Sequence, residues 1–122
     1  MLELKNPGAL FIGGEWAPAP DSEALINPAT EEVFAHVPVG SAVEAEAAIA
    51  AAREAFDRGP WPRMSGRERQ AVLQRFLDAL RARKQEIIPR IIAEAGSTIA
   101  LAHFLQFDTP LKHAQYIVDH SD

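Results

Sequence analysis

The periodicity of the apolar residues changes near residue 41, and this change constrains the fold more than any other feature of the sequence. Residues 1–40 hold more than half of the nine prolines, together with short apolar runs separated by turn residues. Residues 41–122 are rich in Ala, Leu, Arg and Glu, and their apolar residues recur at helical spacing. The sequence therefore predicts an α+β chain, β-rich over residues 1–40 and helical over residues 41–122.

The β-rich part predicts a β-hairpin followed by further short strands. Leu10–Ile12 is an apolar run, Gly13-Gly14 suits a tight turn that requires positive φ, and Glu15-Trp16 begins the returning strand. The run "EALINP" predicts the next strand, which ends at the turn dipeptide Asn27-Pro28. The run "EEVFAHVPV" predicts the last one, and we expect both of its faces to be partly covered because both carry apolar residues. One face holds Val33, Ala35 and Val37, and the other holds Phe34 and His36.

Two capping boxes mark the starts of the first two helices. Ser41 is followed three residues later by Glu44, and Ser65 is followed in the same way by Glu68. Gly59-Pro60 ends the first helix. The apolar stripes at helical spacing are Ala45, Ala48, Ile49, Ala52 and Phe56 in the first helix, and Val72, Leu73, Phe76, Leu77 and Leu80 in the second.

Two prolines predict how the remaining helical sequence is divided. We place Pro89 in the first turn of a separate helix that starts near Gln85, where its missing N–H costs little, and Gly96 just past the end of that helix. Pro110 should kink or divide the last helical segment. The face predicted for that segment consists of Ala100, Phe104, Phe107, Leu111, Ala114 and Val118. The sequence thus predicts three or four helices.

Composition excludes several classes of function. The net charge of −5 argues against nucleic acid as a partner, because phosphate binding requires a basic surface. No apolar run approaches the roughly 18 residues of a membrane span, and the first residues lack the apolar core of a secretory signal. We therefore expect no membrane partner and a cytoplasmic location. The absence of cysteine excludes disulfides and a thiolate nucleophile within these 122 residues.

The chain also lacks recognised cofactor and metal motifs. Gly13-Gly14 fits a hairpin turn, since neither GxGxxG nor GxxxxGK[ST] occurs in the sequence. The four histidines have no metal-binding spacing. We therefore predict no catalytic and no cofactor-binding residue in this chain. The arginines among residues 63–83 predict a solvated helix face with ion pairs to Glu68, Asp78 and Glu86, and an anion site is the alternative interpretation.

Four blocks of sequence together resemble the N-terminal portion of the NAD(P)-dependent aldehyde dehydrogenase superfamily. In chain order they read "LFIGGEW", "INPATEEVFAHVPVGS", "AAIAAAREAFDRGPW" and "SGRERQAVLQRFLDALRARKQEI". The resemblance covers about Leu10 to Gly96, and residues 97–122 match less specifically. Glu31 stands where the family often has Gly, and Ser97 stands where it often has Lys.

The resemblance implies a fold and a chemistry for the complete enzyme. The segment would join a Rossmann-like α/β cofactor-binding domain, with the catalytic domain absent from this chain. In the complete enzyme a cysteine thiolate attacks the aldehyde, hydride passes to NAD or NADP, and an activated water releases the carboxylic acid. Some family members also bind a monovalent cation in this region. The matching positions here are the carbonyl groups of Leu25 and Ile26 and the side chain of Glu94, which supply part of a coordination shell.

Two functional hypotheses follow from these observations. The first is an N-terminal fragment of an aldehyde dehydrogenase, itself inactive. The second is a stand-alone, non-catalytic helical interaction or scaffold domain. The extent of apolar surface favours the first and predicts a partner, which is either the remainder of the enzyme or a second copy of the chain. The expected contact residues are Phe76, Ile88, Ile92, Phe104 and Leu111.

Overall fold

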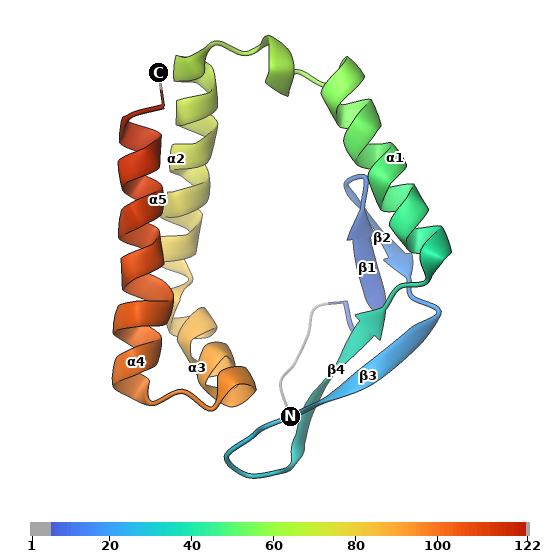
Figure 1. The fold of residues 1–122 in the computed structure, drawn as a ribbon, viewed down its shortest axis with the longest axis vertical. Helices are drawn as coiled ribbons and strands as arrows, with labels where there is room; N and C mark the ends of the chain where they lie inside the picture. Colours follow the sequence, from blue (N-terminus) through green and yellow to red (C-terminus); the bar gives the residue numbers. More distant parts are fainter. Residues whose placement is uncertain (1–5, 122) are drawn as a thin grey trace. The chain divides into compact units, whose positions relative to one another are not determined.

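The computed structural model describes residues 6–121 of the chain. The chain forms two compact units, Met1–Pro62 and Arg63–Asp122, each with its own set of packed elements (Figure 1). The first helix belongs to the same unit as the strands. The change from strand to helix near residue 40 is therefore not the boundary between the compact units. The α+β class predicted from sequence is confirmed, and each unit is described below by itself.

The first unit opens with the predicted hairpin. Strands β1 (Ala9–Ile12) and β2 (Glu15–Pro18) pair antiparallel, and Phe11 lies opposite Trp16 with ring centroids 5.0 Å apart. Gly13 and Gly14 connect them with φ angles of 62° and 92°. Positive φ at both central residues is the geometry of a two-residue hairpin turn, which is what the paired glycines predicted.

A second antiparallel hairpin follows, formed by β3 (Asp21–Ile26) and β4 (Val33–Val39). Both strands were expected from the sequence, but their mutual pairing was not. Only part of the expected coverage of β4 is present, because Ala35 is buried and Phe34 and Val37 are half-buried, whereas Val33 and His36 are exposed. The pairing is irregular between Leu25 and Ile26 at the end of β3.

The turn between β3 and β4 holds a residue in an unfavourable backbone conformation. Glu31 has φ of 60°, in the left-handed region that favours glycine. Its N–H donates to the carbonyl of Asn27 at 2.8 Å, and the N–H of Asn27 donates to the carbonyl of Glu32 at 2.9 Å. These bonds close the turn around Glu31. The family that this sequence resembles often has Gly at this position. The positive φ explains that preference, because glycine adopts it without steric cost.

Helix α1 (Ala42–Arg58) begins and ends where the sequence predicts. The Ser41 hydroxyl accepts from the N–H of Val43 at 3.1 Å, and the Ser41 N–H donates to the Glu44 carboxylate at 2.8 Å. The side-chain and backbone hydrogen bonds from Ser41 lower the pKa of Glu44. At the other end, the N–H of Gly59 donates to the carbonyl of Ala55.

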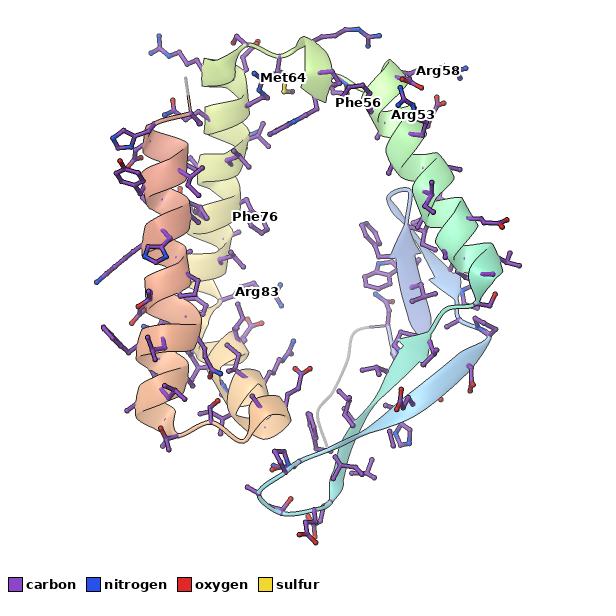
Figure 2. All side chains as sticks on the ribbon, viewed as in Figure 1. Arg53, Phe56, Arg58, Met64, Phe76 and Arg83 are labelled. Atoms are coloured by element: carbon purple, nitrogen blue, oxygen red, sulfur yellow. The ribbon has the colours of Figure 1, made fainter. Side chains whose placement is uncertain are left out.

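The expected apolar stripe of α1 is exposed along its whole length, including its alanines, and among the alanines of the helix only Ala51, outside that stripe, is half-buried. Helix α1 contacts β1. Ala51 lies close to the hairpin turn, because a Cβ atom placed on Gly13 would be 3.6 Å from the Cβ atom of Ala51. Ile49 and Phe56 remain exposed, and the Arg53 guanidinium lies 5.1 Å from the centroid of the Phe56 ring (Figure 2). The two largest residues of the stripe therefore remain mostly uncovered by the described part of this unit.

The second unit is built on two long helices that lie side by side and run antiparallel (Figure 1). After a short 3₁₀ turn (Trp61–Arg63), α2 (Gly66–Ala82) starts at the capping box of Ser65 and Glu68, as predicted. Its partner, α5 (Thr109–Asp119), packs against it through the buried residues Leu77 and Val118. Of the ion pairs expected for the arginine face, those of Arg81 with Asp78 and of Arg83 with Glu86 are present. The Glu68 carboxylate instead accepts hydrogen bonds from Ser65.

Helix α3 (Lys84–Ala95) differs from the sequence-based expectation at its proline. Pro89 lies inside the helix, beyond its first turn, and its side chain is exposed. The neighbouring isoleucines face the core of this unit, and their burial offsets the hydrogen bond that the proline removes. The end of the helix is as predicted, since Gly96 has φ of 64° and its N–H donates to the carbonyl of Ile92.

A π-helical turn divides the last helical segment. Helix α4 (Ile99–His103) passes into a π-helical turn (Phe104–Asp108) and then into α5, with Pro110 in the first turn of α5. The N–H of Thr109 donates to the carbonyl of Phe104, five residues earlier. The division expected from Pro110 is confirmed. It takes the form of a π-helical turn, which is wider than an α-helical turn and accommodates one extra residue.

The extra residue of the π-helical turn corrects the predicted face of this segment. The buried residues Ala102 and Phe107 are five positions apart, whereas Ala100 and Phe104 are exposed. Ala102 and Phe107 form the core of the unit with Ile88, which is 3% exposed. Ile88 was expected at a contact surface, and this expectation is wrong because the turn places Phe107 against it. The half-buried residues around this core are Ile87, Ile91, Ile92 and Leu111.

Candidate functional site

The cation-site residues implied by the resemblance lie in different units. Leu25 and Ile26 are the last residues of β3 in the first unit, at the irregular step of the strand pairing. Glu94 lies in the last turn of α3 in the second unit, with an exposed side chain. The irregular pairing at Leu25 and Ile26 perturbs the regular ladder of backbone hydrogen bonds there. The joint role of the three residues stays a prediction.

The residues that the structure describes, 6–121, do not form a dinucleotide site. Such a cofactor needs a glycine-rich loop that opens a helix and presents free N–H groups to its phosphates. Gly13-Gly14 instead joins two antiparallel strands. At the starts of α1 and α2, the hydroxyls of Ser41 and Ser65 each accept from one N–H group, and the carboxylates of Glu44 and Glu68 add negative charge. The negative charge makes both places less favourable for a pyrophosphate.

Metal ligands are likewise not gathered together in the part of the chain that the structure describes. Among residues 6–121, no group of three or more His, Cys, Asp or Glu side chains is placed to hold a metal ion. His120 illustrates the alternative use of these side chains. Its Nδ1 lies 2.7 Å from the carbonyl oxygen of Tyr116, and the two rings stack at 4.2 Å.

One concave surface of the second unit is largely apolar. A groove of about 290 Å³ lies between α2, α3 and α5. Phe76, which is 60% exposed, projects from α2 at its edge (Figure 2). Such a surface can receive apolar side chains of another segment. The other residues that matter for its apolar character are Leu80, Ile87, Ile91, Pro110 and Leu111.

The first unit presents a second apolar groove beside its hairpin turn. This groove has a volume of about 560 Å³ and lies between β1, the turn and α1. Phe11 and Ile12 line one side, and Ala48, Ala52 and Ala55 line the other. Small residues on α1 leave room for a close approach of another segment. Each unit therefore offers its own apolar contact surface.

A set of glutamines holds α2 against α5, and sequence reasoning missed it. The Gln70 side chain donates to the carbonyl of Val118 at 2.7 Å. The side chains of Gln74 and Gln115 exchange hydrogen bonds, and Arg81 donates to Gln115 at 2.5 Å. The signal available in the sequence was the spacing of Gln70 and Gln74, one helical turn apart on the α2 face that meets α5.

Within residues 6–121, none of the helices combines the length and the apolar content that crossing a membrane requires.

Comparison with known proteins gives a consistent result. The model of the aldehyde dehydrogenase family matches residues 16–122. Among curated proteins, the chain is 44% identical over 110 residues to 3-sulfolactaldehyde dehydrogenase of Pseudomonas putida, a match that covers 84% of this chain and 22% of that protein. It is 38% identical over 99 residues to aldehyde dehydrogenase 1 of Tanacetum cinerariifolium, covering 80% of this chain and 20% of that protein.

Solved structures agree with this similarity. The fold superposes on a mutant of aldehyde dehydrogenase C of Pseudomonas syringae in complex with NAD+ and octanal, with a TM-score of 0.89 and 35% identity. That match covers 98% of this chain and 24% of the other. An NAD-dependent aldehyde dehydrogenase of Sinorhizobium meliloti gives a TM-score of 0.84 with 32% identity, covering 93% of this chain and 23% of the other.

The coverage is strongly asymmetric. The chain spans about a fifth of the length of the curated relatives it matches. Almost all of this chain thus corresponds to a limited part of each longer protein.

Proposed function

Because the chain belongs to the aldehyde dehydrogenase family, we propose that it is the N-terminal portion of an NAD(P)-dependent enzyme that oxidises an aldehyde to a carboxylic acid. The family match over residues 16–122 is the observation that carries this proposal. The share of about a fifth of the relatives' length and the absence of cysteine both support it. The alternative, a stand-alone scaffold domain, gains no support from these matches.

The role of this portion in the complete enzyme is structural. Its apolar grooves receive the remainder of the enzyme, which is the partner, and a second copy of the chain is the alternative occupant when that remainder is missing. Phe76 and Phe104 are exposed and remain suitable contact residues, and Ile92 and Leu111 are half-buried. Burial of apolar area of this kind contributes about 25 cal/mol per Å² before the entropy of association is subtracted.

Catalysis and cofactor binding belong to residues outside these 122. The complete enzyme would use NAD or NADP, and the Pseudomonas syringae relative with bound NAD+ supports this choice of cofactor class. The monovalent-cation role of Leu25, Ile26 and Glu94 remains part of the proposal. A cytoplasmic location is also proposed, and a 33% identical mouse relative named as cytosolic supports it.

An activity assay of the purified 122-residue chain tests the proposal that catalysis requires residues outside it. We expect no aldehyde-dependent formation of NADH or NADPH above a blank without aldehyde, because no thiolate can form the covalent intermediate. The assay should include a short aliphatic and an aromatic aldehyde with either cofactor. Aldehyde-dependent reduction of either cofactor by this chain would overturn the proposal that its role is structural.

A further inference from the structure

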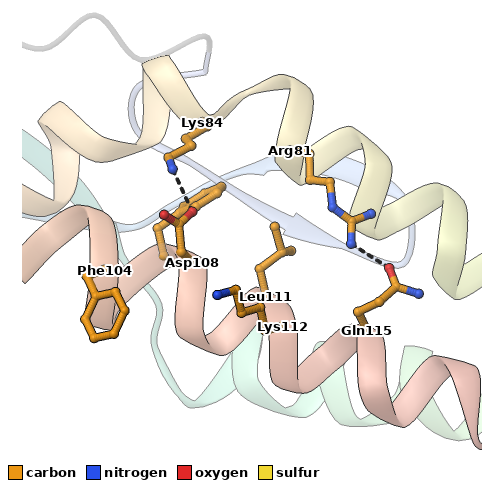
Figure 3. Close-up of a pocket in the computed structure, with 8 residues that line it drawn as sticks. Arg81, Lys84, Phe104, Asp108, Leu111, Lys112 and Gln115 are labelled. Atoms are coloured by element: carbon orange, nitrogen blue, oxygen red, sulfur yellow. Dashed lines mark hydrogen bonds and ion pairs between the residues drawn. The ribbon is translucent and has the colours of Figure 1, made fainter.

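A second groove in the Arg63–Asp122 unit combines basic and apolar side chains (Figure 3). Its volume is about 440 Å³, within the range of roughly 300–1,000 Å³ that is usual for small-molecule sites. Phe104 and Leu111 supply apolar surface, and Arg81, Lys84 and Lys112 supply positive charge. Such a concentration of cations contrasts with the net charge of −5 of the whole chain.

The cations that line the groove differ in the ion pairs and hydrogen bonds that they form. Lys84 forms an ion pair with Asp108 at 2.6 Å and lies 5.5 Å from the centroid of the Phe107 ring. Arg81 donates to Asp78 and to Gln115. These contacts fix the positions of both cations at the groove, and they leave further N–H donors on the Arg81 guanidinium.

Lys112 differs from these two cations. No acceptor is in hydrogen-bond or ion-pair contact with its ammonium group among the described residues, and no dashed line reaches it in Figure 3. Asp108, one helical turn before Lys112, is the acidic residue placed to pair with it, but Asp108 is already held by Lys84. The groove therefore carries one cation without an internal partner, beside an exposed phenyl ring.

We propose that this groove binds an organic carboxylate with an apolar body, with the carboxylate held by Lys112 and Arg81 and the apolar body against Phe104 and Leu111. A bidentate hydrogen bond to the guanidinium would complement the point charge of the lysine. The apolar part gains from contact with Phe104, which is 63% exposed. This proposal concerns residues 81–115 only and does not rest on the proposed function.

A titration of the ¹⁵N-labelled 122-residue chain with hexanoate, followed by amide chemical shifts, tests the site. We expect saturable shifts around Arg81, Phe104 and Lys112. Acetate provides the charge without the apolar body, and 1-hexanol provides the apolar body without the charge, so neither should reproduce the saturable pattern at the same concentrations. Equal affinity for 1-hexanol, or no saturable shift with hexanoate, would overturn the proposal.

Matched variants separate the two halves of the site. Lys112→Gln should weaken hexanoate binding about two- to fivefold, the magnitude typical of an exposed ion pair. Arg67→Gln removes the same charge at an exposed position near the start of α2 that does not line the groove, and it should leave the affinity unchanged. Phe104→Ala should also weaken binding. Wild-type affinity in Lys112→Gln, with the fold confirmed by the same spectra, would contradict the assignment.

Discussion

At each capping box, a serine and a glutamate hold the first turn of a helix. The Glu44 carboxylate accepts from both the Ser41 hydroxyl and the Ser41 N–H, and Glu68 is bound in the same way by Ser65. These hydrogen bonds favour the ionised carboxylate and lower the pKa of both glutamates below their ordinary value of 4.5. A lowered folded-state pKa links the stability of each helix start to pH.

We predict that both helix starts lose this stabilisation in acid. A group whose pKa is lower in the folded state stabilises the fold above its unfolded pKa, and the stabilisation disappears as the pH falls through the folded pKa. The loss should therefore begin near the ordinary value of 4.5 and continue below it. Circular dichroism at 222 nm as a function of pH measures it. The double variant Glu44→Gln/Glu68→Gln should show a smaller acid-dependent loss than wild type.

The control for this experiment is Glu46→Gln, which removes an exposed carboxylate of α1 that belongs to neither capping box. Its acid profile should follow that of wild type. Identical profiles for wild type and the double variant would show that the two carboxylates do not contribute through their ionised forms.

Glu31 offers a second test at the scale of one residue. Its φ of 60° costs about 1–2 kcal/mol for a residue with a side chain, and glycine avoids this cost but loses about 0.5–1 kcal/mol through chain entropy. We predict that Glu31→Gly raises the free energy of unfolding by up to about 1.5 kcal/mol. Urea denaturation measures the change.

The matched control is Glu32→Gly, since Glu32 is also exposed but has no positive φ. It should lower stability by about 0.5–1 kcal/mol, because only the entropic cost of glycine applies there. Equal effects of the two substitutions would mean that the backbone at Glu31 is not strained.

At the scale of elements, the sequence predicted the helix starts but not the face of the last helical segment. The capping boxes are local patterns, in which Ser41 and Ser65 determine where α1 and α2 begin. The exposed and buried faces near residue 104 depend on the π-helical turn, which forms where Pro110 interrupts the ladder and Phe107 packs on Ile88. This packing joins residues nearly twenty positions apart, and helical periodicity carries no information about it.

Two alanines distinguish the observed register from an uninterrupted helix. Ala102 is fully buried against the core, so Ala102→Leu should overpack it and lower stability by about 1–3 kcal/mol. Ala100 is exposed, and Ala100→Leu should change stability by less than about 0.5 kcal/mol. Thermal or urea denaturation of both variants provides the comparison. A larger loss of stability from Ala100→Leu than from Ala102→Leu would indicate an uninterrupted helical face and contradict the π-helical turn.

At the scale of the whole molecule, the two units limit what sequence reasoning can predict about the site. The implied cation ligands Leu25 and Ile26 belong to one unit and Glu94 to the other, so their meeting depends on how the units are held together. Periodicity and capping describe single elements and contain no such information. The family membership could be predicted, because several blocks of sequence contribute to it along most of the chain.

The exposed aromatic residues predict self-association of the isolated chain. Phe76 and Phe104 present apolar surface that folding of the second unit does not cover. Light scattering coupled to gel filtration at micromolar concentration should detect a dimer or a larger species. The double variant Phe76→Ser/Phe104→Ser should shift the chain toward the monomer. A wild-type chain that is monomeric and fails to bind a hydrophobic dye would show that its apolar faces are already covered.

The central claim is that this chain supplies a structural portion of an aldehyde dehydrogenase, and fragment complementation tests it most directly. The 122-residue chain is co-expressed with 3-sulfolactaldehyde dehydrogenase of Pseudomonas putida from which the matching portion has been removed, a relative 44% identical over 110 residues. We predict that the shortened enzyme alone is inactive and that the chain restores aldehyde-dependent NADH formation. Leu77→Asp, which places a charge in the core between α2 and α5, should abolish the rescue, and Arg67→Gln should retain it. Failure of the folded, soluble chain to bind the shortened enzyme or to restore its activity would contradict the account.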